Sequence, residues 1–222
     1  MLTSYCKHER IQAFTLQSDS NYIAQNAGRI TRALFEVCLK RGWSSLARHY
    51  LELSKGIEKR VGAEASPLRQ FEVLPHQVVN KVEEKGLTPE RIITMSGGEI
   101  GRLIREQKWG SKVLALAYNL PYLSIEHRVQ PITRAILRIT LHIIPDFQWN
   151  NHYHGLMECW HLWVEDGEHE RVYQSETLNY GRKQYDAREE VVMEFTIPIQ
   201  DPPPPQYFVR AVSDRWVDVE TC

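Results

Sequence analysis

The fold is decided by residues 18–43, SDSNYIAQNAGRITRALFEVCLKRGW. Small polar residues at 18–20 are typical of a helix start, and Gly42 is typical of a helix end. Between them, apolar residues recur at spacings of three and four, which is the pattern of a helix packed on a core. The stripe consists of Ile23, Ala27, Ile30, Leu34, Val37 and Cys38. The pattern predicts one long amphipathic helix that buries this stripe.

Polar side chains gather on the opposite face of this helix. At about 100° per residue they centre on one row. The row consists of Gln25, Arg29, Arg32 and Glu36. Spacing alone favours an ordinary solvated face. The alternative is a helix that lies along a strand of nucleic acid and offers two guanidinium groups to its phosphates.

The composition is that of a soluble globular protein without a strong overall charge. The 222 residues include 27 Lys and Arg against 28 Asp and Glu, for a formal net charge of −1. No global basic field therefore indicates nucleic acid, and any such site must be local. No run is long or apolar enough to span a membrane, and the N-terminal residues lack the apolar core of a signal peptide.

The cysteines indicate the redox compartment. Four are present, without paired spacing: Cys6, Cys38, Cys159 and Cys222. Cys38 belongs to the apolar stripe and is predicted to be a small buried hydrophobe. Scattered cysteines favour a reducing compartment over a disulfide framework. We therefore expect an intracellular protein, nuclear or cytoplasmic.

More helices follow in the first half of the chain. Residues 44–61 repeat the helical spacing after a serine cap, which predicts an αα-hairpin with the first helix. Shorter helices are predicted at 74–86 and within 88–120. The Ser-Gly-Gly turn between two of them resembles a helix-hairpin-helix turn. Its Gly97 and Gly98 could let backbone N–H groups approach a phosphate, although a plain tight turn is favoured.

Alternation replaces helical spacing after Pro121. In 136–143 every second residue is apolar, which is the pattern of a strand with one buried face. Further strands are predicted at 159–166, 171–178, 191–199 and 206–217. The prolines at 202–205 cannot join a ladder, and a rigid corner between strands is favoured over a ligand for a proline-reading domain. Helices followed by strands predict an α+β fold with an antiparallel sandwich.

Motifs of catalysis are missing from the sequence. It lacks a GxxxxGK(S/T) loop for nucleoside triphosphates, a GxGxxG turn, a GxSxG elbow and an HExxH helix. Its carboxylates are spread over surface patterns, and no pair is placed for acid–base work. We therefore expect no active site and no cofactor in this chain.

Two clusters have a ligand-binding alternative. His152 and His154, with Cys159 and His161 nearby, could share a zinc ion, but their spacing matches no standard zinc module. Structural histidines are the favoured interpretation. An aromatic and basic group near the C-terminus could stack on bases, but packing in the sandwich core is favoured. That group consists of Tyr207, Phe208, Arg210, Arg215 and Trp216.

Several phrases, in this order, resemble one known module. They are the stretch 18–43, SPLRQF (66–71), EIGRLI (99–104), QPITRAILRITLHIIPDFQWN (130–150), WVED (163–166), FTIPI (195–199) and PPQYFVRAVSDRW (204–216). Over nearly its whole length, the chain resembles the Sec-sixty-three homology domain of large superfamily-two (DExH) RNA/DNA helicases.

The resemblance implies three parts. They are a helical bundle at 1–72, a helix-loop-helix piece at 73–120 and an immunoglobulin-like (fibronectin-type) β-sandwich at 121–222. One bundle helix of the family, the ratchet helix, contacts the single strand that a motor pulls, and it matches 19–41 here. The implied contacts are Gln25, Asn26, Arg29 and Arg32, with Gly97 and Gly98 as secondary candidates.

The resemblance also implies partners, namely single-stranded RNA or DNA, the motor domains of a longer parent, and proteins that dock on the sandwich. The sequence departs from the family pattern because both RecA-like motor domains are absent. We therefore expect no ATP turnover by this chain, whereas its parent would be an ATP-dependent 3′–5′ helicase. The first bundle helices are expected to be cut at Met1, and the last sandwich strand is expected to be missing after Cys222.

These observations predict a non-catalytic accessory module of a helicase, which guides the single strand through the motor and docks partner proteins. The alternative is a protein-interaction scaffold without direct contact to nucleic acid.

Overall fold

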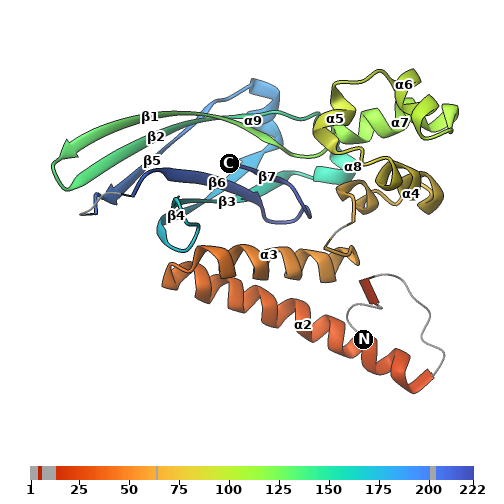
Figure 1. Ribbon diagram of the computed structural model, residues 1–222, viewed down its shortest axis with the longest axis horizontal. Coiled ribbons are helices and arrows are strands. Elements are labelled where there is room, and N and C mark those ends of the chain that lie inside the picture. The colour runs from red at the N-terminus through yellow and green to blue at the C-terminus, as the bar shows by residue number, and fades with distance from the viewer. Residues whose placement is uncertain (1–4, 7–13, 64, 201–203) are drawn as a thin grey trace. The chain divides into compact units, whose positions relative to one another are not determined.

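The computed structural model describes residues 5–6, 14–63, 65–200 and 204–222. The fold is α+β, as predicted, with helices first and strands afterwards (Figure 1). The chain forms two compact units. Unit 1 comprises 1–29, 52–120 and 216–218, and unit 2 comprises 30–51, 121–215 and 219–222. No helix among the described residues has the length and apolar character needed to cross a membrane.

The first long helix, α2 (Phe14–Arg41), begins earlier than predicted. The polar residues at 18–20 do not cap it but lie inside it, because helix propensity is a weak preference that tertiary packing overrides. The predicted end is correct. Gly42 adopts φ +78°, the Gly42 N–H donates to Leu39 O (3.1 Å), and the Trp43 N–H donates to Cys38 O (2.9 Å). This pair of bonds is a Schellman motif, which favours glycine at that position.

The predicted buried stripe of α2 is wrong. Of its six members only Cys38 is buried, whereas Ile30 is 59% exposed and Val37 50% exposed. The buried face consists instead of Ser20, Ala24, Gly28, Thr31, Phe35 and Cys38. It is rotated from the predicted stripe by roughly one residue, or about 100°. A Cβ at Gly28 would already touch Ile57 and Glu58 at 3.8 Å, so the small residues allow the next helix to pack closely.

Helix α3 (Ser44–Lys59) begins at the predicted serine, and its Ile57 is buried. Leu46 and Leu53 are exposed, while Ala47 and Leu51 are fully buried. In both helices, exposed large aliphatic side chains lie beside a buried face that includes small residues. A pattern weighted toward large residues therefore points to the wrong face.

The rest of unit 1 consists of short, capped helices. They are the 3-10 helix η1 (Pro67–Gln70), α4 (His76–Glu84), α5 (Pro89–Ile93), α6 (Gly97–Leu103) and α7 (Gln107–Ala117). Each of η1, α5 and α6 begins with a serine or threonine whose side chain accepts a backbone N–H bond.

Three residues from near the C-terminus, 216–218, complete unit 1. The buried Lys55 ammonium donates to Trp216 O (2.9 Å) and pairs with Glu52. Gln70 and Val217 exchange two hydrogen bonds, of 2.8 and 2.9 Å. Because each buried polar group finds a partner, this segment is fixed in the helical unit.

Unit 2 contains two antiparallel sheets (Figure 1). The three-stranded sheet has the order β1 (Leu123–Thr133), β2 (Ile136–Pro145), β5 (Val191–Pro198). The four-stranded sheet has the order β4 (Val172–Gly181), β3 (Met157–Asp166), β6 (Tyr207–Ser213), β7 (Glu220–Thr221). The five predicted strands are present, although the last ends at Ser213 and not at residue 217. Strands β1 and β7 and the short helices α8 (Asn151–His154) and α9 (Arg182–Ala187) were not predicted. The predicted proline corner at 202–205 lies partly outside the described residues.

Both faces of the four-stranded sheet are covered in unit 2. Its inner face packs against the other sheet around residues such as Trp160, Leu162 and Phe195. Its outer face receives the part of α2 and α3 next to Gly42, as Figure 1 shows. The second core consists of Phe35, Cys38, Ala47, Leu51, Trp163, Val172 and Val212. The end of the helical hairpin is therefore an integral part of the sandwich unit.

Candidate nucleic-acid interface on helix α2

The polar row of α2 is accessible along most of its length. Gln25, Arg29 and Glu36 are exposed, and the half-buried Asn26 donates its side-chain amide to Tyr22 O at 2.8 Å. The row lies on one flank of the helix, between the buried face and the flank that carries the exposed aliphatic residues. An exposed guanidinium and two amides on one flank can donate hydrogen bonds to phosphate and sugar oxygens.

Arg32 differs from Arg29 because it is engaged within the protein. Its Nη2 pairs with Oδ1 of Asp214, its Nη1 lies 3.4 Å from Asp214 O, and its side chain is 30% exposed. The guanidinium also lies 5.5 Å from the ring centre of Phe35. Of the two arginines that the sequence places in the row, one therefore already holds a carboxylate.

Tyr22 belongs to the same flank, although it is not among the contacts predicted from the sequence. It lies three, four and seven positions before Gln25, Asn26 and Arg29, and its side chain is 71% exposed. Aromatic rings next to basic groups stack on bases of single-stranded nucleic acid without strong sequence preference. The position of Tyr22 seven residues before Arg29, two helical turns away, is the sequence signal that could have identified it.

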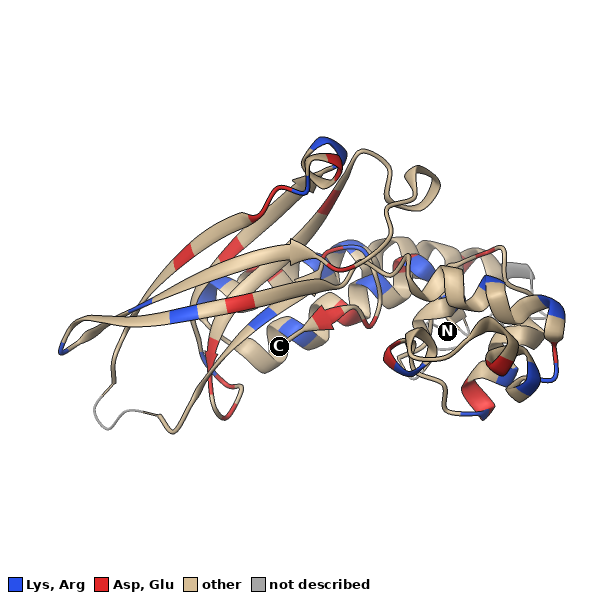
Figure 2. Cartoon of the chain, turned by 90° about the horizontal axis from the view of Figure 1, so that it is seen from above, with Lys and Arg blue, Asp and Glu red and all other residues tan. Residues whose placement is uncertain are grey.

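The charge around this row is local. Figure 2 shows Lys and Arg interspersed with Asp and Glu along the helices and strands. Helix α2 itself has no acidic residue in its first turn and ends with Lys40 and Arg41. A strand that binds here would therefore depend on a few close contacts and not on a field of the whole protein.

The secondary candidates Gly97 and Gly98 lie at the start of α6. A Cβ at Gly97 would lie 2.6 Å from Oγ and 2.8 Å from Cα of Ser111, so this glycine is required for packing against α7. The Ser96 N–H, at 2.8 Å, and its hydroxyl donate to Glu99, and these bonds lower the pKa of that carboxyl. The place where a phosphate would bind thus already holds a negative charge. Gly98 has open space around its Cβ position.

The histidine and cysteine candidates have structural partners. His154 is fully buried, and its Nδ1 accepts the Asn150 N–H at 2.9 Å, while His161 Nε2 lies 2.7 Å from Asp214 Oδ1. Among the described residues, no three His, Cys, Asp or Glu side chains form a group that could hold a metal ion. Burial raises the pKa of the Cys159 thiol, which disfavours the reactive thiolate.

Most of the aromatic and basic group near the C-terminus is engaged in contacts within the protein. Arg210 and Trp216 are buried, and Arg215 Nη2 donates to the buried Glu158 at 2.5 Å. Base stacking on this group is therefore disfavoured, because Arg210 and Arg215, which would contact the phosphates, are paired with carboxylates.

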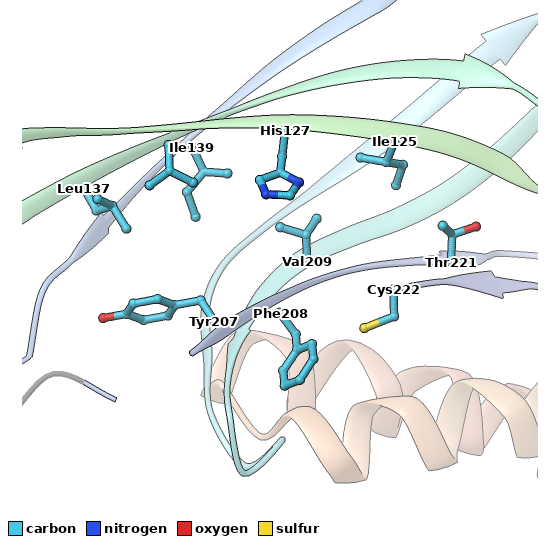
Figure 3. Close-up of a pocket in the computed structure, with 10 residues that line it drawn as sticks. Ile125, His127, Leu137, Ile139, Tyr207, Phe208, Val209, Thr221 and Cys222 are labelled. Carbon is cyan, nitrogen blue, oxygen red and sulfur yellow. The ribbon is translucent and has the colours of Figure 1, made fainter. Parts of the chain in front are cut away.

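Tyr207 and Phe208 of β6 line an apolar groove of about 480 Å³ between the two sheets. Figure 3 shows Val209 of β6 pointing toward His127 of β1, with Ile139 and Ile125 on either side of His127 and with Thr221 and Cys222 at one end. The lining offers aliphatic and aromatic surface with few polar groups. The ten described residues that line it include no Asp or Glu side chain, so the groove suits an apolar ligand.

Comparisons with known proteins identify a family and several similar proteins. It matches the Sec63 Brl domain family over residues 1–222. It is 45% identical to activating signal cointegrator 1 complex subunit 3 of Gallus gallus and 43% identical to that of Homo sapiens, each over 221 residues. It is 40% identical over 221 residues to the U5 small nuclear ribonucleoprotein 200 kDa helicase of Homo sapiens. These matches cover 99% to 100% of this chain but only 10% of each relative.

Proposed function

Because the chain belongs to the Sec63 Brl domain family, we propose that it is a non-catalytic accessory module of an ATP-dependent helicase. In this proposal the polar flank of α2 contacts the single strand, RNA or DNA, that the motor moves. The observation that carries the proposal is the exposed row of Tyr22, Gln25 and Arg29 on a helix whose other side is packed.

The proposed contact is weak by itself and independent of base sequence. A guanidinium that neutralises one phosphate releases a counterion, so affinity falls with salt, with a slope of about 0.7 per contact for single strands. Arg29 makes this contact, the amides of Gln25 and Asn26 position the backbone, and Tyr22 stacks on a base. Arg32 contributes to a lesser extent because of its ion pair with Asp214.

The longer parent supplies the rest of the activity in this proposal. The chain spans 10% of the length of its curated relatives, which include the U5 small nuclear ribonucleoprotein 200 kDa helicase. We infer that motor domains elsewhere in the parent bind ATP and pull the strand, while this module guides it in the nucleus or cytoplasm. Of the two secondary candidates, Gly97 and Gly98, only Gly98 has open space around it, and a phosphate there would have to displace the Glu99 carboxylate from Ser96.

The test is a salt titration of binding by the 222-residue chain to labelled oligouridine and oligothymidine, read by fluorescence anisotropy at low ionic strength. Arg29→Ala should weaken binding and lower the salt slope by about 0.7. The matched control is Arg128→Ala, which removes an exposed arginine from β1. Equal effects of the two substitutions would contradict a specific role for α2.

A second candidate function is docking of the motor domains, or of partner proteins, without contact to nucleic acid. The exposed aliphatic flank of α2 favours it, because Ile30, Leu34 and Val37 form a row of apolar side chains in water. Under this alternative, Ile30→Glu with Leu34→Glu would release the module from the motor domains of its parent in a binding assay. Arg29→Ala would then leave every readout unchanged.

A further inference from the structure

Asp214 lies where a phosphate would meet Arg32. Nη2 of Arg32 pairs with Oδ1 of Asp214, and Nη1 of the same guanidinium lies 3.4 Å from the main-chain oxygen of Asp214. The guanidinium fork binds carboxylate and phosphate oxygens with the same geometry. One edge of Arg32 is therefore occupied by an anion of the protein itself.

This anion is held in place by the sandwich. The Asp214 N–H donates to Cys159 O of β3 at 2.9 Å, and His161 Nε2 lies 2.7 Å from the same Oδ1 that Arg32 contacts. The His161 ring in turn packs edge-on against the buried Phe35 of α2, with 4.8 Å between ring centres. Asp214 is thus fixed by strand and ring contacts, and Arg32 folds toward it.

The ion pair is accessible enough to be exchanged. The side chains of Arg32 and Asp214 are 30% and 26% exposed, and pairs of such exposure contribute little to stability. A phosphate on the polar flank can therefore compete with the Asp214 carboxylate for the same fork. Arg29, by contrast, is exposed and needs no such exchange.

We propose that Asp214 is a positioning residue that holds Arg32 away from the strand until a phosphate replaces it. This inference rests on the proposed function of α2. It makes the two arginines unequal, since Arg29 binds whenever a strand is present and Arg32 binds only at the expense of the Asp214 pair. His161 supports the arrangement by keeping the carboxylate in place.

The test compares Asp214→Asn with the unchanged 222-residue chain in the same salt titration. Asparagine keeps the shape and an oxygen near His161 but removes the charge. We expect affinity for oligouridine to rise about fivefold, the size of effect such an ion pair has. The salt slope should steepen by about 0.7, because one more phosphate is contacted. Both changes should disappear when Arg32→Ala is added.

Glu36→Gln is the matched control, because it removes an exposed negative charge from the same helix without freeing an arginine. If Glu36→Gln raises the affinity by changing the overall charge, that rise should persist when Arg32→Ala is added. If Asp214→Asn behaves like the unchanged chain, or if its gain survives Arg32→Ala, the positioning role is wrong.

Two outcomes separate this inference from the proposed function. If Arg29→Ala weakens binding but Asp214→Asn changes nothing, only the positioning role fails. If neither substitution alters a salt-dependent affinity, the α2 site itself fails. Thermal unfolding checks that each variant is folded, and Asp214→Ser replaces Asp214→Asn if the latter does not fold.

Discussion

The guanidinium of Arg210 donates to Oε1 of Glu165 from Nε, at 3.0 Å, and from Nη2, at 2.9 Å, with both side chains buried. The other carboxylate oxygen accepts the Trp163 indole N–H at 2.7 Å and the Ser44 hydroxyl. Ser44 is the first residue of α3, so one carboxylate joins that helix to β3 and β6. The helical hairpin is fixed to the sandwich unit at this point.

Glu165→Gln should destabilise the protein by on the order of 3 kcal/mol, because it removes the carboxylate that the buried Arg210 contacts through two nitrogens and leaves the more exposed ion pair with Glu220. The measurement is chemical denaturation followed by circular dichroism. Glu168→Gln, in the exposed turn after β3, is the control and should change the free energy of unfolding by less than about 0.5 kcal/mol. If Glu165→Gln and Glu168→Gln have equal free energies of unfolding, the proposed structural role of Glu165 is wrong.

Acid should weaken the fold through the same carboxylate. Burial opposes ionisation of Glu165, but hydrogen bonds from Arg210, Ser44 and Trp163 outweigh it and hold the pKa below the ordinary value of 4.5. A pKa depressed by folding contributes stability that is complete above the unfolded value and is lost as pH falls through the folded value. Below pH 4.5 the unchanged chain should therefore lose stability more steeply than Glu165→Gln. Parallel curves for the two proteins would contradict this assignment.

Gly110→Ala, within α7, should disrupt the packing of α7 against α6. The new Cβ would lie 2.0 Å from Gly97 O and 2.6 Å from Gly101 N, both backbone atoms, so the helices must separate. We expect the free energy of unfolding, measured by thermal or chemical denaturation, to fall by about 1–3 kcal/mol. Gly98→Ala is the matched control, because nothing lies within 4 Å of its Cβ position. It should be neutral or stabilising by up to about 1 kcal/mol. A mild effect at Gly110 would show that the two helices are less closely packed.

Tyr22→Ala should weaken single-strand binding by about 1–3 kcal/mol if the ring stacks on a base, whereas Tyr22→Phe should retain binding. Anisotropy with the same oligonucleotides measures both. The side chain is 71% exposed, so neither substitution should alter the unfolding temperature much. Weak binding by both variants would assign the effect to the hydroxyl and not to stacking.

Much of the fold could be predicted because its patterns are local. Alternation in 136–143 defined a strand whose Ile139, Leu141 and Ile143 are indeed buried, and Gly42 marked the end of α2. Strand β1 was missed because His127 and Pro131 interrupt the apolar alternation of Leu123, Ile125 and Val129, and most of its residues are exposed. The family resemblance is confirmed by the match over residues 1–222.

The candidate site depended on information that periodicity does not carry. The burial of α2 is set by small residues such as Ala24 and Gly28, which allow close packing, and the large aliphatic residues drew the prediction to the wrong face. The pairing of Arg32 with Asp214 joins positions 182 residues apart, so no local pattern could reveal it. Which groups on the row are accessible therefore had to come from the structure.

The most direct measurement of the central claim is site-specific photo-crosslinking from helix α2. A photoreactive amino acid replaces Gln25, on the polar flank, or Ile30, on the aliphatic flank, one at a time in the 222-residue chain; both positions are exposed. At about 100° per residue the two positions face different directions. Irradiation with labelled oligouridine at low salt should give a crosslink from position 25 and little from position 30. Equal crosslinking from both positions, or a stronger one from position 30, would contradict the account.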